Sequence, residues 1–422
     1  MTNSVNRNAI WMSIGQVIRL FVQACYFTLI ARTLGVSNYG AFVGVVALVG
    51  MLYPFGALGR GNLLIKDVSR NPDTFQVKWG EALTTLGSCG PLLIGVILLL
   101  SRFLLPRSIP LVVVLLVATS DILGLNLVAL CGQAFQSLER LHWTATLNVM
   151  ISSVRLIGAL ILYSFNRHPT VVQWAYMYFF TTGLTAIVGA WWVSIKLGMP
   201  VFRSIHSWSE AGEGVFFSIG LAAQTIYNDI DKTMLVRLST LTASGIYGAA
   251  YRILDVSFAP VSALLYAAYP GLFREGGAGL RSSLTFAKPI VIKAVAYATT
   301  VSCAIFFGSR LVPIILGAQY HDTATALRWL SPLPILKAVH YFVSDSLSGA
   351  GFQAIRSAIQ VSVAIFNVLL NLWLIPHYSW LGASWASLAS DGALLVSVSV
   401  CAYILMRRGE SRLPSGPVPA EP

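Results

Sequence analysis

Charged side chains are scarce in this sequence: Asp, Glu, Lys and Arg together make up 10% of the 422 residues. Soluble domains carry about 25% charged residues, because their surfaces face water. Hydrophobic residues make up 56% of the chain, and the mean hydropathy is +0.72. So little polar surface excludes a soluble domain of useful size, and the composition predicts an integral membrane protein.

Common catalytic and metal-binding motifs are also missing. The sequence contains no GxxxxGK[ST] phosphate loop, no HExxH and no GxSxG. The five cysteines lie in apolar stretches without a CxxC pair, and the six histidines are scattered. We therefore expect no disulfide framework, no zinc site and no cofactor.

Apolar stretches long enough to cross a bilayer recur along the whole chain. A hydrocarbon core of about 30 Å needs about 20 apolar residues in a helix, and a backbone in lipid must satisfy its own hydrogen bonds. The stretches do not alternate strictly, which favours helices over strands. Twelve spanning helices are expected at residues 9–30, 39–60, 81–101, 108–135, 143–165, 171–195, 214–237, 243–269, 286–307, 325–349, 354–375 and 381–405.

The distribution of positive charge predicts the orientation in the membrane. Lys and Arg collect in cytoplasmic loops. With the N-terminus inside, the inner segments hold more than twice as many Lys and Arg residues as the outer segments. We therefore expect cytoplasmic N- and C-termini, and most of the net charge of +12 is explained without nucleic acid. The polar, proline-rich stretch 407–422 predicts a disordered cytoplasmic tail.

A short sequence is repeated near the start and the middle of the chain. Residues 34–41 read LGVSNYGA, and residues 241–249 read LTASGIYGA. Each copy follows the first helix of a set of six, and an even number of helices preserves the orientation. We therefore expect two parallel six-helix halves, residues 1–205 and 206–406, around a central cavity, an architecture found in transporters.

Ionisable residues inside the expected spans are functional candidates, because they are costly in lipid. They follow helical spacings; Gln16, Arg19 and Gln23, for example, share one face of the first span. Such faces predict a wet central cavity. The most deeply placed cations suit an anionic ligand, and Arg suits phosphate. These cations are Arg19, Arg155, Lys232, Arg252 and Lys337.

Carboxylates inside the spans are candidates for coupling transport to protons or sodium ions. They are Asp229, Asp231, Asp255 and Asp391. Because Asp229 and Lys232 are one helical turn apart, as are Arg252 and Asp255, neutralisation within each helix is an open alternative. Polar faces can also hold helices together, at about 0.6–2 kcal/mol per contact.

Several segments resemble the polysaccharide (oligosaccharidyl-lipid) flippases of the multidrug/oligosaccharidyl-lipid/polysaccharide exporter superfamily. The resemblance extends over essentially the whole chain. It rests on residues 31–42, on Asn228-Asp229-Ile230-Asp231-Lys232-Thr233, on residues 245–253 and on Tyr269-Pro270. The stretches around residues 228–253 are the most specific.

The resemblance implies an all-helical carrier that works by a rocker-switch motion. It implies transfer of an undecaprenyl-diphosphate-type glycan from the cytoplasmic to the periplasmic leaflet of a bacterial inner membrane. The product would be O-antigen lipopolysaccharide, capsule or exopolysaccharide, with a polymerase and glycosyltransferases as partners. Related peptidoglycan-precursor flippases are similar in carrying cavity arginines where this chain has Arg19, Arg60 and Arg252. Those relatives usually have fourteen helices, whereas twelve are expected here.

Two other functions are alternatives to a flippase. One is a proton- or sodium-coupled multidrug exporter of the same fold, in which the four aspartates bind the ion. The other is a membrane glycosyltransferase or polymerase, which commonly needs acidic residues on sizeable outer loops. Asp322 is the exception on outer loops otherwise almost without acidic residues. The sequence therefore favours a transporter over an enzyme.

Overall fold

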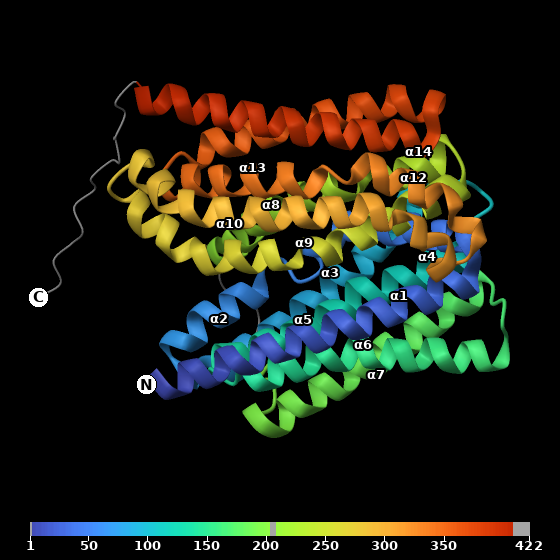
Figure 1. Ribbon diagram of the computed structural model, residues 1–422. Coiled ribbons are helices and arrows are strands. Elements are labelled where there is room, and N and C mark those ends of the chain that lie inside the picture. The colour runs from blue at the N-terminus through green and yellow to red at the C-terminus, as the bar shows by residue number, and fades with distance from the viewer. Residues whose placement is uncertain (1, 203–207, 408–422) are drawn as a thin grey trace, which may run out of the picture. The chain divides into compact units, whose positions relative to one another are not determined.

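The computed structural model describes residues 2–202 and 208–407, and nearly all of these residues are helical (Figure 1). The expected boundary between residues 205 and 206 and the expected tail from residue 408 lie outside the described residues. Contacts divide the chain into two compact units. Unit 1 extends to Gly248 and includes Ile315–Tyr320, and unit 2 comprises Ala249–Ile314 and the residues from His321 onward.

Unit 1 is built from long helices joined by short turns. Most of its helices precede the undescribed residues 203–207. They are α1 (Thr2–Leu52), η1 (Tyr53–Phe55), α2 (Arg60–Arg70), η2 (Pro72–Thr74), α3 (Phe75–Leu104), α4 (Leu111–Ala118), η3 (Thr119–Leu125), α5 (Asn126–Ser137), α6 (Leu141–Phe165), α7 (Val171–Leu197), α8 (Trp208–Leu238), the first turns of α9 (Leu241–Gly276) and η5 (Ala318–Tyr320).

Unit 2 is built in the same way, from the remainder of α9 onward. Its helices are α10 (Leu280–Gly308), η4 (Ser309–Leu311), α12 (His321–Leu330), α13 (Leu333–Gly349) and α14 (Gln353–Arg407), while the residues of α11 (Val312–Leu316) are divided between the two units. In Figure 1, α10, α13 and α14 run side by side, and the contacts between them agree. Ala294 of α10 and Phe342 of α13 belong to a hydrophobic core that also contains Leu272 of α9.

Eight helical stretches among the described residues are long and apolar enough to cross a membrane. They are Ile18–Phe55, Pro72–Leu104, Leu111–Ser137, Leu141–Phe165, Val171–Leu197, Leu241–Gly276, Leu280–Leu316 and Gln353–Arg407. The first and the last each contain two expected spans, and α8 and α12–α13 coincide with the remaining two. Each expected span therefore coincides with a helix, as expected for an all-α integral membrane protein.

At two of the expected loops, a single residue with a non-helical backbone, which we call a kink, separates two helices that share one label. In α1 the kink lies at Gly35, with φ 75° and ψ 164°. In α14 it lies at Ser379, with φ 56° and ψ −134°. Glycine adopts positive φ freely, whereas a serine there is uncommon and is held by its surroundings. The chain therefore reverses direction without a polar loop at these two positions.

The second expected span, 39–60, ends earlier than predicted. Helix α1 stops at Leu52, and Pro54, which has no backbone N–H, lies in the short helix η1. Gly59 then adopts the left-handed conformation, with φ 66° and ψ 4°, and α2 begins at Arg60. Helix α2 buries Leu64 and exposes Lys66. It is therefore a separate amphipathic helix rather than the end of a span.

The two copies of the repeated sequence contact each other. A Cβ atom on Gly40 would lie 1.8 Å from the carbonyl oxygen of Leu241, and one on Gly245 would lie 2.0 Å from that of Val36. The Ser244 hydroxyl donates a hydrogen bond to the carbonyl oxygen of Gly40 at 3.3 Å. Only glycine allows backbones to approach so closely. The repeat therefore forms a tight contact between α1 and the first turns of α9.

Candidate functional site

A buried group of polar side chains surrounds Arg155 in unit 1. Arg155, from α6, has its Nη2 atom 3.8 Å from Oδ1 of Asp121 in η3. The Tyr178 hydroxyl, from α7, donates a hydrogen bond to the same Asp121 oxygen at 2.7 Å. The guanidinium carbon of Arg155 lies 4.1 Å from the centre of the Tyr178 ring. Its Nη2 and Nε atoms donate to Oγ1 of Thr182 at 3.0 and 3.4 Å. We call these four residues the Arg155 cluster.

Local helix geometry explains why these side chains meet. Tyr178 and Thr182 are four residues apart on α7, so they share one face. Asp121 lies in η3, which is a π-helical segment of seven residues. Such segments are rare and occur frequently at functional sites. Three helices therefore each supply one part of the cluster.

The electrostatics of the Arg155 cluster explain its stability. A buried ion pair needs further hydrogen bonds to offset its desolvation. Tyr178 and Thr182 supply them, one to the carboxylate and one to the guanidinium. Arg also stacks on aromatic rings and binds phosphate through a planar fork of donors. The cluster thus holds the guanidinium of Arg155 in a fixed orientation among the helices.

Helix α8 carries the second group of predicted residues. The Lys232 ammonium forms an ion pair with the Asp229 carboxylate one turn away. Asp231 accepts a hydrogen bond from the Tyr247 hydroxyl and is buried. The neutralisation of Asp229 by Lys232, which the sequence left open, is therefore present in the structure. Both carboxylates have polar partners, as buried groups require.

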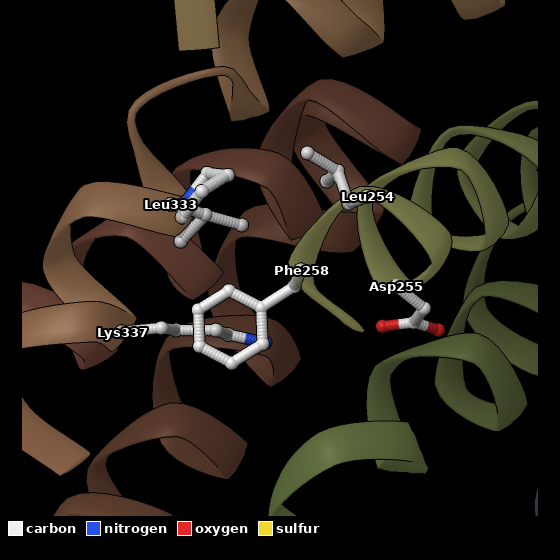
Figure 2. A pocket seen from close by; sticks show the side chains of 6 residues that line it. Leu254, Asp255, Phe258, Leu333 and Lys337 are labelled. Atoms are coloured by element: carbon white, nitrogen blue, oxygen red, sulfur yellow. The ribbon is translucent and has the colours of Figure 1, made fainter. Parts of the chain in front are cut away.

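Lys337 in unit 2 lines a small pocket with Asp255 and Phe258 (Figure 2). The pocket has a volume of about 20 Å³, which exceeds the ~10–15 Å³ needed for one water molecule. The Lys337 ammonium lies 5.6 Å from the centre of the Tyr251 ring, within cation–π range. The structure therefore brings two predicted residues, Lys337 and Asp255, to one pocket between α9 and α13.

A histidine–aspartate pair lies next to this pocket in sequence. Nε2 of His340, three residues after Lys337 on α13, is 2.9 Å from Oδ1 of Asp391 on α14. The side chains are 0% and 5% exposed. Nearby on α14, the Asn367 amide donates to the Ser390 hydroxyl at 3.0 Å. Asp391 is therefore held by a hydrogen bond to a buried imidazole ring.

The other predicted cations occupy different surroundings. Arg60 is buried at the start of α2, where its Nη1 atom lies 3.4 Å from Oε2 of Glu81. Lys78 lies 3.4 Å from the same Glu81 oxygen and 3.1 Å from Oδ2 of Asp67, so α2 and α3 share an ion-pair network. Arg19 in α1 and Arg252 in α9 are half-buried. Within unit 1, Arg60 and Arg155 therefore belong to separate groups.

The sequence analysis missed Asp121, Tyr178 and His340. Asp121 had a clear signal, because it is the single charged residue in the apolar run 111–137. His340 lies one helical turn after Lys337, and the spacing alone pointed to a shared face. Among the described residues, no group of three or more His, Cys, Asp or Glu is arranged to hold a metal ion.

Solved transporter structures share this fold. One is an inward-facing multidrug resistance MATE family transporter of the MOP superfamily, with a TM-score of 0.71 and 14% identity over 94% of this chain and 99% of that chain. Another is the lipid II flippase MurJ in an inward closed conformation, with a TM-score of 0.69 and 13% identity over 93% of this chain and 87% of that chain.

Sequence comparison points to glycan assembly. The probable low-salt glycan biosynthesis flippase Agl15 of Haloferax volcanii is 20% identical over 395 residues, which cover 91% of this chain and 80% of the relative. A family model described as polysaccharide biosynthesis protein matches residues 5–274, more than half of the chain. The chain therefore belongs to the polysaccharide biosynthesis protein family.

Proposed function

We propose that this protein is a flippase that moves a lipid-linked oligosaccharide between the leaflets of a membrane. The observation that carries the proposal is an arginine, Arg155, whose side chain is 16% exposed and held among buried polar groups in the membrane helices of a polysaccharide biosynthesis family member. A lipid diphosphate is the anionic part of such a substrate. A transporter of neutral or cationic drugs has no need of a fixed guanidinium in its helices.

In this proposal, the diphosphate contacts the guanidinium of Arg155. Tyr178 and Thr182 hold the guanidinium plane in place, so little conformational entropy is lost when the diphosphate binds. Asp121 lies 3.8 Å away, longer than a tight ion pair, and it already accepts from Tyr178. Arg155 therefore retains donors for a second anion. Lys337, in its pocket in unit 2, is the corresponding candidate in the other unit.

We propose that the energy for transport enters through a coupled proton or sodium ion. The His340–Asp391 pair is the candidate for a proton site, because the two side chains are hydrogen-bonded to each other inside the helices. A membrane potential also acts on any charge that crosses, at about 2.3 kcal/mol per charge per 100 mV. The proposed direction is from the cytoplasmic to the periplasmic leaflet of a bacterial inner membrane, with both termini cytoplasmic.

A flipping assay tests this function. The full chain is reconstituted in proteoliposomes with a fluorescent undecaprenyl-diphosphate oligosaccharide, and a membrane-impermeant quencher reports the leaflet. The variant Arg155→Gln/Asp121→Asn removes both charges and leaves no unpaired carboxylate. We expect its flipping rate to fall at least about tenfold, because hydrogen bonds to charged groups contribute about 1.5–3 kcal/mol.

The control variant is Arg310→Gln, which changes an exposed arginine in η4 and should flip at the wild-type rate. A double variant that flips as fast as wild type contradicts the assigned role of Arg155. Wild-type liposomes that export cationic dyes, but do not flip the glycolipid, establish the alternative, a cation-coupled multidrug exporter.

A further inference from the structure

A second, apolar cavity lies in unit 1 between α3, η3 and α7. Its volume is about 330 Å³, near the lower end of the ~300–1,000 Å³ typical of ligand pockets. Leu123, Phe179 and Ile187 form part of its walls, and Gly87, Gly124 and Gly183 form part of its floor. No charged side chain lines it. We call this cavity the glycine groove.

The glycine groove is open space rather than loose packing. A Cβ atom placed on Gly87 or on Gly183 meets no other atom within 4 Å. On the rim, Ile187 is 68% exposed, and its neighbour Phe180 is 63% exposed. Large apolar side chains that are exposed on a membrane helix face lipid. The occupant of the groove therefore comes from the hydrocarbon phase of the bilayer.

The glycine groove and the Arg155 cluster share a wall. In η3, Leu123 and Gly124 line the groove, while Asp121 belongs to the cluster. A Cβ on Gly124 would lie 3.0 Å from Cγ2 of Thr182, whose hydroxyl accepts from Arg155. The glycine groove and the Arg155 guanidinium thus lie close to each other beside one π-helical segment. An amphipathic lipid with an anionic headgroup would match this arrangement, because its apolar tail adjoins its negative charge.

We propose that the glycine groove binds the isoprenoid tail of the lipid carrier while its diphosphate contacts Arg155; this proposal rests on the proposed function. A volume of about 330 Å³ holds about ten groups of ~30 Å³, the share of one water molecule in the liquid. That is enough for the first units of the tail next to the diphosphate. An isoprenoid chain carries methyl branches, and Gly87 and Gly183 leave the width that such branches need.

Lipid tails gain no hydrophobic energy on leaving the bilayer for a groove, because both surroundings are apolar. The groove therefore acts through packing and orientation, and its occupancy is best measured directly. The probe is a polyprenyl diphosphate with a photoreactive diazirine in its second isoprene unit, in nanodiscs that contain the full chain. Cross-linked peptides are identified by mass spectrometry.

We expect the probe to label peptides of α3 and α7, and excess unlabelled undecaprenyl diphosphate to prevent the labelling. The variants Gly87→Leu and Gly183→Leu each fill the groove and should lower labelling at least about fivefold, equivalent to about 1 kcal/mol. The matched control is Gly392→Leu on α14, where a Cβ also meets no atom within 4 Å. It should label as wild type does.

Three outcomes would overturn the proposal. The probe labels only other segments; or labelling persists in both groove variants; or a phosphatidylglycerol with the same diazirine labels α3 and α7 equally well, which makes the groove a general lipid site. If the proteoliposomes flip glycolipid in any of these cases, the proposed function stands and the groove assignment alone fails. If wild-type protein neither flips the glycolipid nor binds the probe, both proposals fail.

Discussion

Nε2 of His340 lies 2.9 Å from Oδ1 of Asp391, and protein covers both side chains almost completely. A second histidine–aspartate pair, His321 and Asp322, is separated by 3.6 Å and is 82% and 58% exposed. The chain therefore contains a buried pair and an exposed pair of the same chemical type. Variants of the two pairs therefore show how burial changes the contribution of a histidine–aspartate pair to the free energy of unfolding.

We predict that Asp391→Ala lowers the free energy of unfolding by about 3 kcal/mol, because removing one partner leaves the other buried without compensation. Asp322→Ala should change it by less than about 0.5 kcal/mol, since exposed ion pairs contribute little. Thermal unfolding of the purified protein in detergent measures both. The double variant His340→Leu/Asp391→Leu should recover part of the loss. Equal effects of Asp391→Ala and Asp322→Ala would disprove the structural importance of the buried pair.

The glycine contact between α1 and α9 gives a second prediction. Gly40→Ala places a methyl group 1.8 Å from a backbone oxygen, so the two helices have to separate. Overpacking of this kind costs about 1–3 kcal/mol. Gly95→Ala on α3 is the control, because its Cβ meets no atom within 4 Å. We expect a lower melting temperature for Gly40→Ala only; equal melting temperatures would show that the backbone contact is not rigid.

Variants of the Asp229–Lys232 pair distinguish a structural role of Lys232 from a role in substrate binding. Lys232→Gln should lower stability, because Asp229 loses its ion-pair partner. The double variant Asp229→Asn/Lys232→Gln should regain part of this stability, since the carboxylate at position 229 is removed together with its partner. We predict that its glycolipid flipping stays about tenfold slower than that of wild type. Restored flipping in the double variant would assign Lys232 a structural role only.

The sequence predicted the spans well because hydropathy is a local property of each stretch. Every expected span coincides with a helix, although the span at 39–60 stops at Leu52. The sequence did not predict the kinks at Gly35 and Ser379, because a short loop and a kink of one residue cannot be told apart by hydropathy. The kink at Ser379 in particular depends on a backbone conformation that its side chain does not favour.

The candidate site was only partly predictable. Helical spacing identified Arg155 and Lys337, and the turn-by-turn pairing of Asp229 with Lys232 follows from the same rule. The partners of Arg155 come from two other helices, so one sequence alone does not specify them. Asp121 was visible as a lone charge in an apolar run, whereas its π-helical setting depends on how three helices pack.

The backbone of the π-helical segment Thr119–Leu125 determines the positions of both Asp121 and Gly124. A π turn contains one residue more than an α turn of similar rise. Deleting one residue within it would restore a regular helix and change which residues of the segment face each neighbouring helix. Asp121 would then lose its alignment with Tyr178, and Gly124 would leave the apolar cavity. We therefore expect related proteins to keep or lose together the two features of this helix that are proposed to bind the anion and the lipid tail.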